Sequence, residues 1–318
     1  MADRNVILAL ARVIVAAAWA DGELHPEEIA SLKDLLFHLP HVGPARGVEF
    51  PAADWARLEM YIQSPVNAAE RNRLIAELQA ALRTPADREL ALAALDNLLQ
   101  ADGVVLDAEL EVMREIRAAL QAVDLGVIGQ IARLIRGPVR RRSAAIAGAP
   151  NREDAFEDFV KNRIYYLVRE RLRGGTTDLA IPDADMRKLS LAGGLMARVA
   201  NIDRTVTSEE RDAMIAVLQA DWGVSQAAAA LVAEVAVSAV ANDLDYFRLT
   251  REFFSSTDGD ERTHFLDVLF DVAYADGRLS SEEHAEIRRI AESLNLSQRQ
   301  VNDAREQATR RQVDGTAM

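Results

Sequence analysis

A short pattern that recurs four times constrains the fold of this chain more than any other feature. Each copy has Asp at its first position, an aliphatic residue three positions later and Glu seven positions later. Three copies have Gly directly after the Asp, and one has Arg204 instead. Internal recurrence of this kind is typical of duplicated folds, so we expect four similar junctions. The pairs are Asp21 and Glu28, Asp102 and Glu109, Asp203 and Glu210, and Asp276 and Glu283.

The segments around each copy have the periodicity of helices. An apolar stretch precedes every copy and an amphipathic one follows, with apolar residues spaced i, i+3, i+4 and i+7. Aromatic residues make up only 5% of the chain, which disfavours strands. The sequence therefore predicts an all-α protein. Between the copies we expect helices at Ala52–Gln63, Val66–Arg83, Ala86–Gln100, Gln226–Ala241, Tyr246–Ser255 and Glu261–Tyr274.

The spacing of the copies predicts the domain organisation. The first two lie 81 residues apart and the last two 73, whereas 101 residues separate the second from the third. We therefore expect two homologous helical-bundle domains with two motifs each, at 1–136 and 183–308. A basic linker at 137–182 joins them and contains an amphipathic helix predicted to span Arg152–Arg173. Residues 309–318 are expected to form a disordered tail.

The charge of the chain is unevenly distributed. The net charge is -13, yet residues 129–175 hold 11 Lys and Arg against 5 Asp and Glu. The acidic balance argues against nucleic acid as a partner. The basic segment has two interpretations, a solvated linker helix or a docking element for a partner protein or an anionic membrane. The arginines that would dock are Arg140, Arg141, Arg142, Arg163, Arg169 and Arg171.

The motif itself also has two interpretations. In the first, it is a pair of helix caps. Gly after the Asp suits a left-handed residue that ends a helix. Thr207 with Glu210, and Ser280 with Glu283, have the spacing of capping boxes. We further expect Ser64-Pro65 and Thr84-Pro85 to begin the helices that follow them.

In the second interpretation, the motif carboxylates hold a divalent cation. The chain has no cysteine, which excludes thiolate metal sites and cysteine nucleophiles. Only two carboxylates recur in each loop, whereas calcium loops of the EF-hand type distribute more oxygen ligands over twelve residues. A complete site would thus need both loops of a domain to converge, or water ligands of the kind that magnesium accepts.

The repeated Ala-Asp-Gly motif at helix–loop–helix junctions resembles the TerB-like tellurite-resistance family. The resemblance covers about four fifths of the chain, as two tandem TerB-like domains. It implies an all-helical fold, a cytoplasmic or inner-membrane-associated setting, and chelation of calcium or magnesium by the acidic loop residues. The third copy departs from the family pattern because it lacks the glycine.

Two functions follow as hypotheses. The first is a non-enzymatic stress-response adaptor that binds other proteins, and the alternative is a divalent-metal-binding or sensing protein. No nucleophile with its base is recognised, so no catalytic residue is predicted. The apolar stretch 6–20 ends in Ala18-Trp19-Ala20, a pattern like a signal-peptidase site. Asp3, Arg12 and the internal recurrence of a similar stretch favour a core helix and a cytoplasmic protein.

Overall fold

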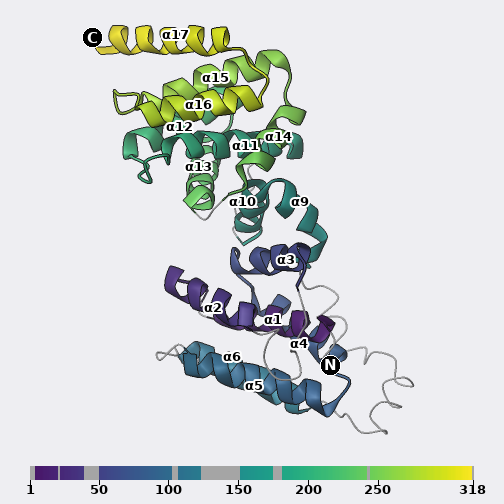
Figure 1. Cartoon of the computed structure of the whole chain (residues 1–318). Coiled ribbons are helices and arrows are strands. Elements are labelled where there is room, and N and C mark those ends of the chain that lie inside the picture. Colours follow the sequence, from purple (N-terminus) through teal and green to yellow (C-terminus); the bar gives the residue numbers. More distant parts are fainter. Residues whose placement is uncertain are drawn as a thin grey trace. The chain divides into compact units, whose positions relative to one another are not determined.

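The computed structural model describes residues 4–20, 22–38, 50–101, 107–122, 151–174, 181–241 and 244–316. Within these ranges the chain forms fifteen α-helices, one 3₁₀ helix and no strand. Figure 1 shows these helices, coloured along the sequence from purple at the N-terminus to yellow at the C-terminus. The predicted all-α class is therefore confirmed. The chain divides into two compact units, Met1–Phe156 and Glu157–Met318.

The first unit is organised around one apolar helix. Helix α1 has nine buried residues and contacts α3 and α4, so it forms the centre of this unit. Its apolar character is that of a core helix, and among the described residues no helix is long and apolar enough to cross a membrane. The elements of this unit are α1 (Arg4–Ala18), α2 (Pro26–His38), α3 (Ala52–Ile62), α4 (Ala68–Ala81), α5 (Pro85–Ala101), α6 (Asp107–Gln121) and η3 (Arg152–Ala155).

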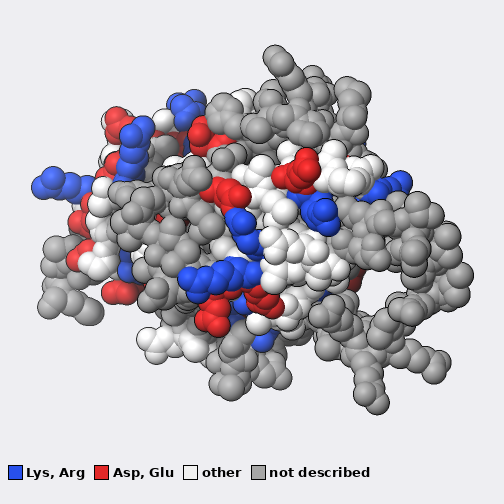
Figure 2. Space-filling model, turned by 90° about the horizontal axis from the view of Figure 1, so that it is seen from below, with Lys and Arg blue, Asp and Glu red and all other residues white. Residues whose placement is uncertain are grey.

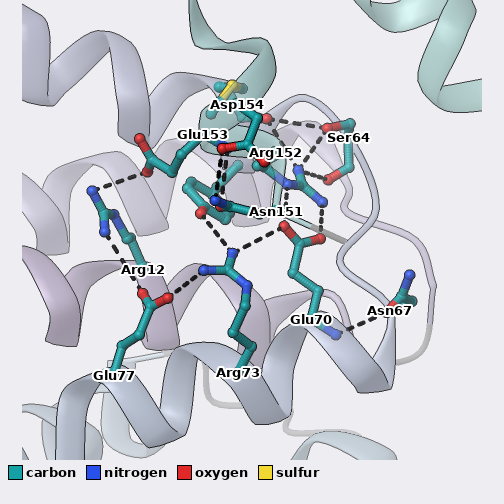
Figure 3. Close-up of polar contacts among 12 residues, drawn as sticks. Arg12, Ser64, Asn67, Glu70, Arg73, Glu77, Asn151, Arg152, Glu153 and Asp154 are labelled. Carbon is teal, nitrogen blue, oxygen red and sulfur yellow. Dashed lines mark hydrogen bonds and ion pairs between the residues drawn. The ribbon is translucent and has the colours of Figure 1, made fainter. Parts of the chain in front are cut away.

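A buried arginine ties the short helix η3 to the rest of the first unit (Figure 3). The Arg152 side chain is 2% exposed and pairs with Glu70, which is equally buried. Its Nε and Nη2 atoms donate to the two Glu70 oxygens at 2.8 and 2.6 Å. Its Nη1 donates to the Ser64 hydroxyl at 2.7 Å, and its Nη2 to the Pro65 carbonyl at 2.8 Å. A segment 82 residues from Glu70 in sequence is thus held in the core.

This pair belongs to a wider polar network. Arg73 pairs with Glu77 and with Glu70, whose Oε1 lies 3.6 Å from Arg73 Nη2. Arg12 of the apolar helix α1 pairs with Glu153 at 2.9 Å. Arg12, which lies within the apolar stretch of α1, therefore has a partly buried carboxylate partner, which offsets the cost of placing its charge there.

The second unit is organised around α11. This helix contacts α10, α12, α13, α14, α15 and α16. Two glycines of α11 allow its neighbours α13 and α10 to pack closely against it. A Cβ on Gly193 would lie 2.9 Å from Val232 Cγ1 of α13, and one on Gly194 would lie 2.5 Å from Ile164 Cδ1 of α10. The helices are α10 (Arg163–Gly174), α11 (Asp183–Ala200), α12 (Ser208–Trp222), α13 (Gln226–Ala241), α14 (Tyr246–Ser256), α15 (Gly259–Ala273), α16 (Ser281–Ser293) and α17 (Gln298–Thr316).

The predicted linker helix differs from the structure. Its described part is divided between the two units, whose boundary in the sequence lies between Phe156 and Glu157. The single helix expected at Arg152–Arg173 is instead η3, then α9 (Phe156–Lys161), then α10, with a break at Asn162. Helix α10 is no solvated linker, since Ile164 and Val168 are fully buried in the core of the second unit.

Two further boundaries differ from the sequence predictions. Helix α4 begins after Asn67, whose side chain accepts the Glu70 amide, whereas Ser64 was expected to cap it. Thr84 does cap α5, because its hydroxyl accepts the Asp87 amide at 3.2 Å. Helix α17 continues to Thr316, so residues 309–316 are helical where a disordered tail was expected. An ion pair of Arg311 with Asp271 at 3.1 Å holds this part of α17 to α15.

Candidate functional site

The third motif copy forms the junction between α11 and α12. Asp203 Oδ1 accepts the Thr205 amide at 2.8 Å, which closes a tight turn. The predicted capping box is confirmed, because the Thr207 hydroxyl accepts the Glu210 amide at 3.1 Å and Glu210 Oε2 accepts the Thr207 amide at 2.7 Å. The carboxylates of this copy are therefore bonded to the backbone of their own loop.

The fourth copy repeats these bonds between α15 and α16. Asp276 Oδ1 accepts the Arg278 amide at 2.8 Å. Ser280 and Glu283 form the second predicted capping box, with the Ser280 amide donating to Glu283 at 2.7 Å. The aliphatic side chains at the fourth position of the motif, Val206 and Leu279, both pack against the core. The recurrence in sequence is thus a recurrence in local structure.

The residue after the Asp adopts positive φ in three copies. Gly22 and Gly277 have φ of 91° and 85°, as the capping interpretation predicts. Arg204 takes the same region, with φ of 70°, although it has a side chain. The third copy therefore keeps its loop conformation without the glycine, and it does so at a conformational cost.

We expect Arg204→Gly to stabilise the second unit by about 1 kcal/mol, because glycine adopts positive φ without the steric penalty of a Cβ. Urea unfolding measures the gain. Arg204→Ala is the matched control, since it removes the side chain but retains the Cβ, and it should give no gain. Equal stabilisation by both variants would contradict the prediction.

The two motif loops of the second unit influence each other electrostatically. Burial raises the pKa of Glu283, and the negative charges of Glu210 and Asp276 raise it further. Glu283 is 9% exposed and Glu210 5%. Carboxylates of both loops therefore lie within electrostatic reach of each other. Across the described part of the chain, however, no three His, Asp or Glu side chains are placed to hold one metal ion.

Only part of the first unit's motifs can be placed. Glu28 Oε2 accepts the His25 amide at 2.7 Å, as a capping glutamate does. Asp21, Asp102 and the side chain of Glu109 lie outside the described residues. The same is true of Arg140, Arg141 and Arg142.

The three remaining docking candidates have partners within the second unit. Arg169 donates to the Tyr165 hydroxyl at 2.9 Å, and Arg171 pairs with Glu234 at 2.6 Å. The guanidinium of Arg163 lies 5.1 Å from the centre of the Phe159 ring. Figure 2 shows one face of the molecule, on which the described basic and acidic side chains are interspersed without a continuous patch of either sign.

Sequence reasoning missed a groove on the second unit, which we name the α14 groove. It measures about 550 Å³ and lies where α11, α14 and α16 contact one another. Its most unusual member is Phe247, a large apolar side chain that is 80% exposed. The groove is lined chiefly by Arg198, Tyr246, Phe247, Glu286, Arg289 and Glu292.

A second hollow, of about 350 Å³, is lined by acidic residues of α12 and α15. Burial raises the pKa of Asp267, although the charges of Arg311 and His264 oppose the shift. His264 in turn contacts Asp221, with 2.9 Å between Nε2 and Oδ2. The partly buried carboxylate of Asp267 is therefore a source of instability near neutral pH.

We expect Asp267→Asn to raise the melting temperature at about pH 7 and to have no effect at about pH 3. The folded protein binds this proton up to a higher pH than the unfolded chain, so the free energy of unfolding falls as the pH rises from the ordinary Asp pKa through the raised one. Thermal unfolding across this range tests it. Asp212→Asn, on the exposed face of α12, is the control. A gain that persists at low pH would contradict the prediction.

A family comparison covers the unit that holds these two motif junctions. Residues 190–306, from within α11 to within α17, match the family model described as Tellurite resistance protein TerB. No curated protein and no solved structure matches the chain. A second TerB-like domain at 1–136 stays a prediction. Residues 190–306 are therefore similar to the TerB tellurite-resistance family, by the match of its family model.

Proposed function

We propose that this TerB-domain protein is a non-enzymatic, cytoplasmic stress-response adaptor that binds a partner protein through its second unit. The described motif carboxylates support a structural role for the motif, because Glu28, Glu210 and Glu283 are bonded as helix caps. Because these carboxylates are used to cap helices, we infer that the second unit acts by binding a partner at its surface and not by catalysis.

The observation that carries the proposal is the exposure of Phe247. An 80% exposed phenylalanine leaves most of its apolar surface in water, which burial against a partner would remove. It lies beside a groove, and aromatic side chains are enriched at the centres of protein interfaces. Phe247 is therefore the residue at which we expect a partner to bind.

Site-specific photo-crosslinking tests the adaptor function. A photoreactive phenylalanine analogue at position 247 of the full chain is expected to give a discrete adduct with a partner protein in cells. The same analogue at Val313, which is 65% exposed on α17, is the matched control. Adducts of equal yield and pattern at both positions, or none at 247, would overturn the proposal.

Divalent-metal binding is a second candidate function. The observation that favours it is the influence of Glu210 and Asp276 on Glu283, which brings carboxylates of two motif loops into one electrostatic neighbourhood. A bound calcium or magnesium ion would offset this repulsion, with water molecules completing its coordination. Asp21 and Glu28, and Asp102 and Glu109, are proposed to do the same in the first unit.

Thermal unfolding tests metal binding. A cation that binds only the folded state raises the melting temperature, so addition of calcium or magnesium after EDTA treatment should stabilise the protein. Glu283→Gln is the control, because glutamine retains a capping acceptor but removes the charge. The metal function fails if wild type shows no shift, or if the variant shows an equal one.

Membrane contact is proposed for the basic run Arg140-Arg141-Arg142. Each basic residue near an anionic bilayer contributes about 1 kcal/mol, so replacing all three with glutamine should weaken binding to phosphatidylserine-rich vesicles by roughly 100-fold. Deleting residues 137–175 would be a poor test, because it removes Ile164 and Val168 from the core. Equal flotation of the wild type and the triple glutamine variant with the vesicles would exclude this role.

A further inference from the structure

The charges of the α14 groove are unbalanced at its wall. Glu286 is 1% exposed and lies between two arginines. Its Oε1 accepts from Arg198 Nε at 3.0 Å, and its Oε2 accepts from Arg289 Nη1 at 2.7 Å. One buried carboxylate thus neutralises only one of two guanidinium groups. Because each guanidinium has five N–H donors, both can donate to a further anion.

The fourth charged residue of the groove, Glu292, pairs with an arginine outside this cluster. Glu292 lines the groove and pairs with Arg288, at 3.9 Å between Oε1 and Nη2. The side chains of Arg198 and Arg289 are 38% and 64% exposed, so an incoming group can reach them. The cluster of Arg198, Glu286 and Arg289 therefore carries one net positive charge, on a unit whose residues 157–318 hold 20 Lys and Arg against 28 Asp and Glu.

The aromatic part of the groove lies next to this charge. The Arg198 guanidinium is 5.6 Å from the centre of the Tyr246 ring, and that ring packs edge-on against Phe247 with 5.5 Å between centres. Along α14, Arg251 and Phe254 follow Phe247 at i+4 and i+7, which places them on the same side of the helix. Their side chains are 70% and 38% exposed. Apolar and cationic groups thus alternate along this surface.

We propose that the α14 groove binds an acidic peptide segment of a partner protein, in which an apolar side chain lies next to a carboxylate. The carboxylate pairs with Arg289 and Arg198, and the apolar side chain packs on Phe247 and Tyr246. This inference rests on the proposed adaptor function and adds the chemistry of the partner. Charge-assisted hydrogen bonds to arginine supply orientation, and burial of Phe247 supplies affinity.

Two other occupants fit the groove less well. An anionic membrane meets a broad surface, and the excess of acidic residues in this unit would repel it, whereas a peptide contacts the groove alone. A second copy of this chain in a two-fold symmetric contact would place the same patch against itself. Arginine would then face arginine, which is unfavourable.

Selection from a random peptide library tests the partner's chemistry. Peptides of about twelve residues are displayed, selected on the full-length protein and counter-selected on Phe247→Ser, whose fold should be intact because the side chain is exposed. We expect enrichment of Asp or Glu beside Leu, Ile or Phe. Enrichment of basic or neutral sequences, or of none, overturns the inference.

A synthetic peptide from the enriched set then gives the quantitative test by fluorescence anisotropy. Replacing its acidic residues with amides should weaken binding about ten-fold, as should Phe247→Ser or Arg289→Met in the protein. Val313→Ser is the matched control and should bind as wild type does. Equal binding of the acidic and amide peptides overturns the inference.

Two further measurements separate the alternatives. Phe247-dependent binding to phosphatidylserine vesicles without peptide binding would assign the groove to a membrane, and Phe247-dependent dimerisation in sedimentation would assign it to a second copy. Either result overturns the inference. A photo-crosslinked partner at position 247, together with equal binding of acidic and amide peptides, would preserve the adaptor function and reject only the acidic chemistry.

Discussion

Replacing Arg152 with alanine is expected to destabilise the first unit by about 3–5 kcal/mol, which is the usual cost of leaving one member of a buried ion pair without its partner. Arg152 and Glu70 are both 2% exposed. The substitution also leaves the Ser64 and Pro65 acceptors without their donor. Loss of its Tyr61 contact, at 4.8 Å from the guanidinium to the ring centre, adds to the cost.

Hydrogen exchange measures this effect unit by unit. Amides of α1 and α4 should exchange faster in Arg152→Ala, whereas those of α11 in the second unit should not change. Arg57→Ala is the matched control, because Arg57 pairs with Glu153 but is 31% exposed, and exposed pairs contribute about 1 kcal/mol or less. An effect of Arg152→Ala no larger than that of the control would contradict the prediction.

A double substitution separates the charge from the packing. Replacing Arg152 with methionine and Glu70 with leucine removes both charges and retains much of the side-chain volume. Buried ion pairs replaced by apolar residues are often neutral or stabilising, so the double variant should recover most of the lost stability. Failure to recover would indicate that the hydrogen bonds of Arg152 to Ser64 and Pro65 contribute more than its charge.

Gly193→Leu is expected to destabilise the second unit by about 3 kcal/mol, the upper end of the usual cost of overpacking. A Cβ at this position would lie 2.9 Å from Val232 Cγ1 and 3.6 Å from Ala236 Cβ. Val232 is β-branched and therefore stiff at its first side-chain torsion, so it cannot rotate away at low cost. The added side chain must push α11 and α13 apart.

The same substitution at an exposed site of α11 gives the control. Ala184→Leu adds a leucine where the side chain faces water, and its effect should stay within about 0.5 kcal/mol. Exchange in α11 and α13 should accelerate in Gly193→Leu only, while α1 of the first unit is unaffected. Comparable stability of the two variants would contradict the prediction, because it would show that α11 and α13 can move apart at little cost.

The sequence predicted those features whose causes are local. Thr207 and Ser280 were identified as caps because a capping box needs only residues three positions apart, and the structure confirms both. Thr84 was identified from another local signal, a Thr followed directly by Pro. Ser64 is likewise followed by Pro, and yet it does not cap α4. Its hydroxyl accepts from Arg152, 88 residues away, and no local pattern contains that information.

In the candidate site, too, the features with local causes were predicted and those that depend on distant contacts were not. The motif glutamates were found from the sequence because they recur at a fixed spacing. The α14 groove was not, since Arg198, Phe247 and Arg289 come from three helices separated by tens of residues. One signal was available, because Phe247 directly follows Tyr246 near the start of an amphipathic helix. Only the packed structure, however, reveals which of the two rings is exposed.

The sequence by itself determined the helical class, the capped junctions and the recurrence of the Asp and Glu motif, because hydrophobic periodicity and capping act over one or two turns of chain. The tertiary structure decided which charges are buried, that α10 belongs to the core of the second unit, and that Phe247 lies exposed beside two arginines sharing one carboxylate. Those features depend on contacts between segments that are far apart in the sequence. Bringing such segments together costs loop-closure entropy, and whether a given contact repays that cost cannot be read from a local residue pattern.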